Sequence, residues 1–447
     1  MLRKRIMRTI SLLLAAAVIA SQLTSCGNGR NRSVVTFRIM SWNEDFRNLM
    51  ETYFVPRHAG LMKNVRLEWV TDEINVYRQS VQRRLEDGEQ IDLFLGDHQM
   101  APFFAADNRV ATLAQLGLKQ NELSEQFRFT GILGSDSHGT QRGAAFSAEP
   151  GILLYRADYA AKYLGITHQE EMQEKLSSWD SFVSVARTLN EKSKGRIKML
   201  PNSAELWKSV DCAMYGLWLS DGMLSVSDNT IGNWLNLVRE LDSVNAFAGA
   251  KTLDDNWYSA IDSGVFCFYA APWLCRSNSA DKADVTTVFS SAKRSGASFG
   301  KFKTSLAPGG FVYGGNWLFC PESSAHKEIA AEIIRAFTCD RDFMRLIALA
   351  EMMYVNNSKV CDELAGMNLP NPLFDGLDAF SVYNSTAQGL EFAAPSVYDT
   401  SISSILYDQT KAYSKGEIRL SQAVYNFRLN VWKKHREITT APRRTRN

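Results

Sequence analysis

The sequence predicts an α/β fold, in which the strands of a sheet alternate with helices that cross over it. Residues 34–41 alternate between apolar and polar side chains, as a half-buried strand does. Tyr77, Val81 and Leu85 are spaced four positions apart, which predicts one face of a helix that Gly88 can end. Residues 91–97 form a short apolar run bounded by turn residues, which is typical of a buried parallel strand. This order of elements predicts right-handed crossovers.

The other elements follow from the same two periodicities of apolar residues. Two come before the helix at Tyr77: a helix marked by Phe46, Met50 and Tyr53, and a strand marked by Val65, Leu67 and Trp69. Five come later: a helix capped by Ser178, a helix over 209–219, a strand over 311–320, a helix marked by Ile329 and Ile333, and a helix over 416–431. Residues 434–447 are basic and are expected to form a solvated tail.

Length and charge limit the classes of function. The chain has 447 residues, enough for two or three domains with a sizeable core. Its 50 Lys and Arg residues nearly balance its 48 Asp and Glu residues. Arg3, Lys4, Arg5 and Arg8 lie in the first ten residues without any acid, so removal of the N-terminus would leave a net charge of −2. Nucleic-acid binding requires a basic footprint, so no nucleic-acid partner is expected.

Residues 1–25 have the layout of an export signal. A basic start is followed by eleven mostly apolar residues at 10–20. This run is too short for a stable bilayer span, which needs about 20 apolar residues. The ending Leu23-Thr24-Ser25-Cys26 resembles the lipobox of bacterial lipoproteins, which implies a lipid on Cys26 and a tether over 26–33. The alternative is an ordinary signal followed by an unmodified cysteine.

The cysteines do not indicate a metal site. Six remain after Cys26, none forms a C-x-x-C pair, and no histidine lies near enough in sequence to suggest zinc. We therefore expect neither a metal nor a cofactor. Cys267 and Cys275 are the closest pair in sequence, and both a disulfide and free thiols remain open for the exported chain.

No catalytic motif of the common hydrolases or nucleotide-binding enzymes is present. Asp136, Ser137 and His138 are adjacent on one short segment, and three neighbours cannot readily form the chain of a catalytic triad, so a polar turn is expected. Carboxylates are numerous, so an acid pair for glycoside hydrolysis is not excluded by counting. We expect a protein that is not an enzyme.

Seven segments, taken in order, resemble the family 1 extracellular solute-binding proteins, the carbohydrate-type receptors of ABC importers. The resemblance covers residues 34–433, although each segment is degenerate. The segments are 91–97, 108–113, 148–158 with its crossover strand, 179–182, 263–273, 299–318 with its glycine pairs, and 416–431. Arg-Ala replaces the usual Asn-Lys at 156–157, and Ala-Pro stands at 271–272 where glycine is common.

The resemblance implies a two-lobed periplasmic-binding-protein-like fold of type II, with the ligand in a cleft between lobes joined by crossing segments. The positions of the segments place lobe one at 34–147 plus 296–343 and lobe two at 148–295 plus 344–433. Each lobe is therefore expected to consist of two discontinuous segments.

A sugar site needs aromatic faces to stack on the sugar ring and carboxylate or amide groups to bind its hydroxyls. Clefts of α/β folds lie beyond the carboxyl ends of strands. The residues that meet these conditions, partly through matching family positions, are Trp42, Glu44, Asp45, Asp97, Glu149, Trp207, Trp273, Asn316, Trp317 and Tyr398. For each tryptophan, core packing is the alternative.

These observations predict a monomeric, lipid-anchored receptor that delivers a sugar or oligosaccharide to the permease subunits of an ABC transporter on the extracytoplasmic face of the cell membrane. One alternative is an exported lipoprotein hydrolase, a glycosidase or an esterase. Another keeps the receptor fold but serves a non-sugar ligand or a sensor kinase.

Overall fold

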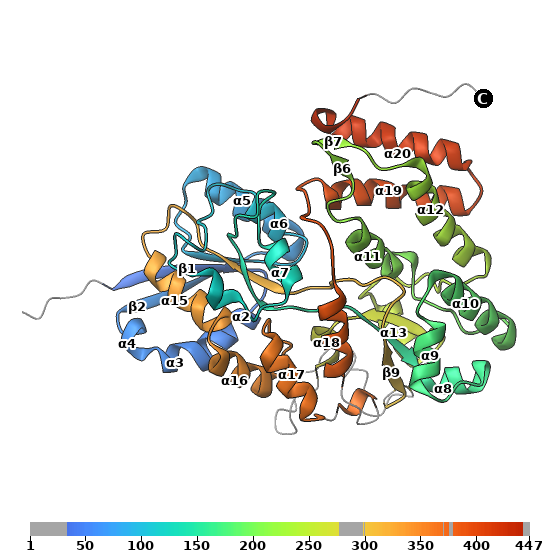
Figure 1. Ribbon diagram of the computed structural model, residues 1–447, viewed down its shortest axis with the longest axis horizontal. Helices are drawn as coiled ribbons and strands as arrows, with labels where there is room; N and C mark the ends of the chain where they lie inside the picture. The colour runs from blue at the N-terminus through green and yellow to red at the C-terminus, as the bar shows by residue number, and fades with distance from the viewer. Residues whose placement is uncertain (1–33, 277–297, 299, 370, 375–378, 441–447) are drawn as a thin grey trace, which may run out of the picture.

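The computed structural model describes residues 34–276, 298, 300–369, 371–374 and 379–440 (Figure 1). The predicted signal segment 1–25, Cys26 and the tether 26–33 lie outside these residues, as do residues 441–447 of the basic tail. Of that tail, the described part contains a short 3₁₀ turn, η5 (Arg436–Ile438), in which Ile438 is buried. Among the described residues, no helix is both long and apolar enough to cross a bilayer.

A five-stranded sheet forms the first lobe, in the order β2-β1-β3-β10-β4. β2 and β3 pair with β1 in parallel, whereas β10 is antiparallel to both of its neighbours. The predicted strands at 34–41 and 91–97 are confirmed, and Gly88 ends the intervening helix at a φ of +69°. The strands are β1 (Val35–Ser41), β2 (Val65–Thr71), β3 (Leu93–Gly96), β4 (Ala144–Ser147) and β10 (Asn316–Phe319).

Helices cover both faces of this sheet, and Figure 1 shows the N-terminal helices beside α15 and α16 from late in the chain. Phe46 packs against Phe337 of α15 with ring centroids 5.0 Å apart, so the two chain segments share one core. The elements are α2 (Asp45–Leu49), η1 (Met50–Phe54), α3 (Val55–Arg57), α4 (Ala59–Met62), α5 (Ile74–Asp87), α6 (Ala101–Ala105), η2 (Gln120–Leu123), α7 (Arg128–Leu133), α15 (Lys327–Thr338), α16 (Arg341–Glu351) and α17 (Ser358–Gly366).

The second lobe contains a three-stranded antiparallel sheet in the order β8-β5-β9, together with a short hairpin. Its strands are β5 (Ile152–Arg156), β8 (Cys267–Ala270) and β9 (Phe302–Ser305), and the hairpin joins β6 (Leu219–Ser220) and β7 (Met223–Leu224). In Figure 1, α10, α11 and α12 lie in this lobe beside α19 and α20.

The helices of the second lobe confirm the capped helix at Ser178, whose hydroxyl accepts the N–H of Ser181 at 3.2 Å. The helix predicted over 209–219 spans Ser203–Met214 instead. Asn202 caps its start, and the chain leaves the helical conformation at Tyr215 and at Gly216, which has a φ of +69°. The elements are α8 (Ala157–Tyr159), η3 (Ala160–Leu164), α9 (Gln169–Lys175), α10 (Trp179–Ser193), α11 (Ser203–Met214), α12 (Asp228–Ser243), α13 (Asp255–Asp262), α14 (Pro272–Cys275), η4 (Pro372–Phe374), α18 (Phe380–Gly389), α19 (Asp399–Ser414) and α20 (Leu420–Lys434).

The chain passes between the two sheets after β4 and again between β9 and β10. The predicted boundary at 296 is wrong, because β9 pairs with β5 and the chain therefore returns to the first lobe only after Ser305. The boundary at 343 is also too early. Val355 bridges Ser147 of β4, and the N–H of Ser358 donates to Glu125, so this stretch packs on the first lobe.

All six cysteines that the structure describes are free thiols. Cys267 lies in β8 and Cys275 in α14, and both are buried. The disulfide that their spacing left open is therefore not formed in this structure.

Candidate ligand-binding site

A cavity of about 450 Å³ lies between the two lobes. One side, the strand-end wall, consists of residues that follow β1 and β3: Trp42, Asn43, Asp45, Asp97, His98 and Gln99. The opposite side, the helix wall, comes from α11, α14 and the residues directly after them: Lys208, Asp211, Cys212, Tyr215, Trp273 and Arg276. Glu149 and residues 312–316 of the crossing segments, with Ile74 and Leu253, complete the lining.

Six of the ten predicted site residues line this cavity: Trp42, Asp45, Asp97, Glu149, Trp273 and Asn316. Trp42, Asp45 and Asp97 lie there because β1 and β3 are parallel and their carboxyl ends meet at one edge of the sheet. Glu149 and Asn316 lie there because the chain crosses between the lobes at both positions.

The other four predicted residues lie outside the cavity lining. Glu44 is exposed at the start of α2, where it pairs with Arg47 at 3.2 Å. Trp317 is fully buried, and its indole donates to the carbonyl oxygen of Thr130 at 2.9 Å. Adjacent residues of β10 face opposite sides, so the side that turns Asn316 toward the cavity turns Trp317 into the core.

Trp207 and Tyr398 also lie away from the cavity. Trp207 is buried on α11, where it packs against Tyr407 with ring centroids 5.1 Å apart. Tyr398 precedes α19 and packs on His435 at 5.2 Å. In both cases the ring has the core or surface packing that was the alternative to ligand stacking.

Glu149 holds Trp273 in place at the cavity. The Glu149 carboxylate is buried and accepts the N–H of Trp273 at 2.8 Å, while its other oxygen pairs with Arg276 at 3.4 Å. The indole of Trp273 in turn donates to the carbonyl oxygen of Tyr313 at 2.8 Å. Burial raises the pKa of Glu149, and the positive charge of Arg276 opposes this shift. The Trp273 ring is therefore fixed at both its backbone and its indole nitrogen.

Two consecutive glycines bring the return crossing close to this tryptophan. Gly314 and Gly315 have φ angles of +105° and +92°, which side chains other than glycine rarely adopt. A Cβ at Gly314 would lie 3.1 Å from the Trp273 ring, and one at Gly315 would lie 2.8 Å from Trp317. The N–H of Gly314 donates to Nδ1 of His98 at 3.2 Å, which places the imidazole proton on Nε2. Burial lowers the pKa of His98, so this ring is neutral.

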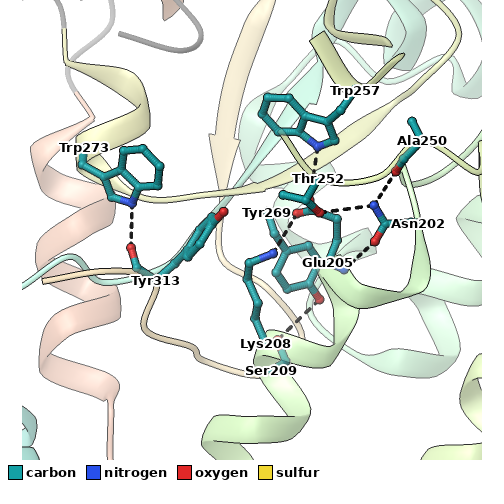
Figure 2. A network of polar contacts seen from close by, with 10 residues as sticks. All are labelled: Asn202, Glu205, Lys208, Ser209, Ala250, Thr252, Trp257, Tyr269, Trp273 and Tyr313. Carbon is teal, nitrogen blue, oxygen red and sulfur yellow. Dashed lines mark hydrogen bonds and ion pairs between the residues drawn. The ribbon is translucent and has the colours of Figure 1, made fainter. Parts of the chain in front are cut away.

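Lys208 forms an ion pair with the buried carboxylate of Glu205, as Figure 2 shows. Glu205 has no exposed surface, and its Oε2 lies 3.3 Å from the Lys208 ammonium. Its Oε1 accepts from the hydroxyl of Thr252 at 2.7 Å and from the indole of Trp257 at 3.2 Å. The ammonium also lies 4.4 Å from the centre of the Tyr313 ring. Lys208 is thus a cation of the helix wall with a fixed position.

Asp211 is oriented by a two-step chain of hydrogen bonds. The hydroxyl of Ser403, on α19, donates to the Asp211 carboxylate and accepts the indole N–H of Trp207 at 3.0 Å. Burial raises the pKa of Asp211 to about 6, although the hydrogen bond from Ser403 and the charge of Lys208 both oppose the shift. Trp207 therefore helps to orient Asp211 through Ser403, and its ring does not line the cavity.

The Asp136-Ser137-His138 segment is a turn, as expected. One carboxylate oxygen of Asp136 accepts the N–H groups of His138 and Thr140, each at 2.9 Å. The carboxylate is used to close the turn, and none of the three residues lines the cavity between the lobes.

Comparison with known proteins now decides the family. The family described as "Bacterial extracellular solute-binding protein" matches residues 60–355, which is more than half of the chain. The chain belongs to the bacterial extracellular solute-binding proteins. This confirms the family and the two-lobed α/β fold that the sequence predicted. A search of curated protein sequences found no match.

Solved structures of similar fold cover nearly the whole chain. A crystal structure described as an extracellular solute-binding protein of family 1 has a TM-score of 0.72 at 15% identity, covering 88% of this chain and 98% of that one. The galacto-N-biose-/lacto-N-biose I-binding protein of the ABC transporter from Bifidobacterium longum has a TM-score of 0.66 at 13% identity, with 92% and 100% covered. The sugar-binding protein MalE from Xanthomonas citri gives 0.66 at 13%, with 88% and 95% covered. At these identities the likeness establishes the fold.

Sequence reasoning missed several polar residues of the solute-binding protein's cavity: His98, Lys208, Asp211, Tyr215, Arg276 and Tyr313. His98 could have been found, because it follows Asp97 at the end of a predicted strand. Lys208 directly follows Trp207 on α11, so its side chain points about 100° around the helix from the aromatic residue that was chosen. Asp211 is four positions after Trp207, on the same face, and only the contacts of the folded chain distinguish the two.

Proposed function

We propose that this solute-binding protein binds a sugar or an oligosaccharide in the cavity between its lobes and delivers it to the permease of an ABC transporter. The observation that carries the proposal is the composition of the cavity. Aromatic rings from both lobes, Trp42 and Trp273, lie in one cavity with carboxylates from both lobes, Asp97 and Asp211. Such a lining offers stacking surfaces together with hydroxyl acceptors. Two of the similar structures are described as sugar-binding, which supports this choice of ligand.

Closure of the lobes is the proposed mechanism. The cavity is lined from both lobes and from the crossing segments, so a solute gains its full set of contacts only when the lobes approach each other. Phe392 lies between α18 and α19, and its ring packs on Phe129 of α7 at 6.2 Å and on Tyr215 at 5.3 Å. Phe392 thus connects the first lobe to a residue of the helix wall. The closed form is the state that a permease would recognise.

A thermal-shift screen of oligosaccharides, amino acids, polyamines and phosphate esters tests the ligand class, followed by calorimetry of each hit. Saturable binding of a saccharide that closes the lobes in small-angle scattering would support the proposal. Binding confined to non-saccharides would refute the sugar assignment. Release of reducing sugar or acyl groups with robust turnover, abolished by one acid variant, would instead support the exported hydrolase.

We also propose that a lipid on Cys26 anchors the protein at the extracytoplasmic face of the membrane. The support is the sequence Leu23-Thr24-Ser25-Cys26 directly after the apolar run, together with the extracellular family. Two acyl chains hold a protein stably at a membrane, whereas one gives marginal attachment. Cys26→Ser should release or mis-process the protein in cell fractionation, and normal membrane retention would contradict the anchor.

A further inference from the structure

Both cations in the cavity lining are already matched by buried carboxylates. Lys208 lies 3.3 Å from Glu205, which has no exposed surface, and Arg276 lies 3.4 Å from Glu149, of which 1% is exposed. Removing a buried partner from such a pair leaves an uncompensated charge, so each pair behaves as a neutral unit. His98 adds no charge, because burial lowers its pKa. An anionic solute would therefore have to compete with Glu205 and Glu149 for the charges of Lys208 and Arg276.

The three other acids of the lining form no ion pair within the described residues, although the charge of Lys208 acts to lower the pKa of one of them, Asp211. Across the described part of the chain, no ion pair joins Asp45, Asp97 or Asp211 to a lysine or an arginine within 4.0 Å. Their hydrogen bonds come from neutral groups: the amide of Asn43 to Asp45 at 3.2 Å, the backbone N–H groups of residues 99 and 100 to Asp97 at 2.9 Å, and the hydroxyl of Ser403 to Asp211.

These carboxylates belong to both walls of one cavity, and Tyr215 lies in the same lining. Burial raises the pKa of Tyr215, and the negative charges of Asp211 and Asp97 raise it further. Asp97 follows β3 in the first lobe, whereas Asp211 lies on α11 in the second lobe. Closure of the lobes brings the two sets of negative charges together and removes water from between them.

Closing this cavity on a neutral solute would leave like charges facing each other with reduced solvation, which is costly. A cationic group on the solute removes this cost, because it gives the acids an opposite charge and up to three hydrogen-bond donors. The rings of Trp42, Trp273 and Tyr215 are left to contact the apolar faces of the same molecule. The unpaired acids and the aromatic rings therefore favour a solute that carries both a cationic group and apolar faces.

We propose that the solute is an amino sugar that carries a free, protonated amine, held between Asp97 of the strand-end wall and Asp211 of the helix wall. This inference rests on the proposed function, because it takes the solute to be a saccharide bound in this cavity.

Calorimetry on the full chain at neutral pH and low ionic strength tests the inference with three probes of equal length. The probes are the β-1,4-linked disaccharide of glucosamine, its N-acetylated neutral counterpart and a uronic acid disaccharide. We expect the free amine to bind at least about tenfold tighter than the neutral probe, which corresponds to one hydrogen-bonded charge pair. Its affinity should fall as salt is added, and the uronic acid should bind weakest.

Two variants and a control locate the charge. Asp97→Asn and Asp211→Asn should each weaken binding of the glucosamine disaccharide by about tenfold. They should change binding of the N-acetylated disaccharide much less. Asp342→Asn removes an exposed acid of α16 that does not line the cavity, and should leave both affinities unchanged. Thermal unfolding shows whether each variant is folded. If a variant does not fold, the inference is tested by the salt dependence of the affinity of the unaltered protein for the glucosamine disaccharide, which should fall as salt is added.

The outcomes separate this inference from the proposed function. Equal or tighter binding of the N-acetylated or uronic acid probe would overturn the amino-sugar assignment and leave a sugar receptor. Tight binding of a non-saccharide amine, with no binding of any saccharide in the screen, would overturn both.

Discussion

The two walls of the cavity differ in how their polar side chains are held. On the strand-end wall, Asp45 is exposed and is supported by one amide at 3.2 Å, and Trp42 rests edge-on against Tyr77 at 5.2 Å. On the helix wall, Lys208 is supported by Glu205, which has no exposed surface, and Trp273 by the buried Glu149. Apart from the buried His98, the first wall is built from loop residues that are at least partly exposed, and the second is braced by buried carboxylates.

The two kinds of support follow from the elements that carry the side chains. Strand ends bring side chains together through sheet topology alone, so the strand-end wall needs little additional support. A helix presents only a few side chains to a cavity, and their charged ends must be matched by partners behind them. If the helix wall is the part that fixes the solute, changes to its support should have larger effects than matched changes on the strand-end wall.

The largest effect should come from removing the carboxylate behind the helix wall. Glu205→Ala leaves the Lys208 ammonium without its pair and the donors of Thr252 and Trp257 without an acceptor. Breaking a buried pair in this way costs about 3–5 kcal/mol, measured as the free energy of unfolding in urea. The matched change on the strand-end wall, Asn43→Ala, should cost about 1 kcal/mol or less. Equal losses in the two variants would show that the walls are braced alike.

The second effect concerns the affinity for the solute that the screen identifies. Trp273→Ala removes a ring fixed by Glu149 and Tyr313, so affinity should fall by about 1–3 kcal/mol, which is about 5–150-fold. The unfolding temperature of the unliganded protein should change by only a few degrees. Trp42→Ala should cost less affinity, because its ring is held by one edge contact. Calorimetry on both variants measures the ratio, and a greater loss in Trp42→Ala would reverse the ranking of the walls.

The sequence predicted the strand-end wall better than the helix wall for a physical reason. Trp42, Asp45 and Asp97 follow apolar runs whose ends are visible in the sequence, and parallel pairing brings these ends together. Trp207 and Trp317 lie outside the lining, whereas an adjacent residue of each, Lys208 and Asn316, lies in it. Moving one position along a helix turns the side-chain direction by about 100°, and moving one position along a strand turns it by about 180°.

Long-range pairing explains the rest of what the sequence could not supply. The roles of Lys208 and Arg276 depend on Glu205 and Glu149, and the second of these pairs is separated by more than a hundred residues. β9 has four residues and no clear apolar alternation, so its pairing with β5 could not be read from its pattern. The order of segments was enough to predict two lobes and the family. The positions at which the chain crosses between the lobes could be located only from the observed strand pairing.

The third effect is the dependence of stability on pH at the helix wall. Asp211 has a pKa of about 6 in the folded protein, above the ordinary value of about 3.9. The protonated form is therefore favoured by folding, and this contribution is fully present below about pH 4 and is lost as the pH rises through about 6. Asp211→Asn should remove this loss, so the variant should gain of the order of 1–2 kcal/mol over the wild type between pH 4 and pH 7. Thermal unfolding across this range measures the gain, and a constant difference between the two proteins would contradict it.

The smallest effect should come from an acid that adjoins the strand-end wall without lining the cavity. Glu44 pairs with Arg47 on the exposed side of the turn, and its neighbour Asp45 lines the cavity. Surface substitutions of this kind usually change free energies by about 0.5 kcal/mol or less, so Glu44→Gln should alter the affinity for the solute less than about twofold. Asp45→Asn, one residue away, should weaken binding several-fold, because it removes a carboxylate from the lining. Both variants change an acid to its amide, so a difference between them in calorimetry reports the position of the residue. If Glu44→Gln weakened binding as much as Asp45→Asn, the strand-end wall would have to extend beyond the residues that line it, and the contrast with the braced helix wall would lose its structural basis.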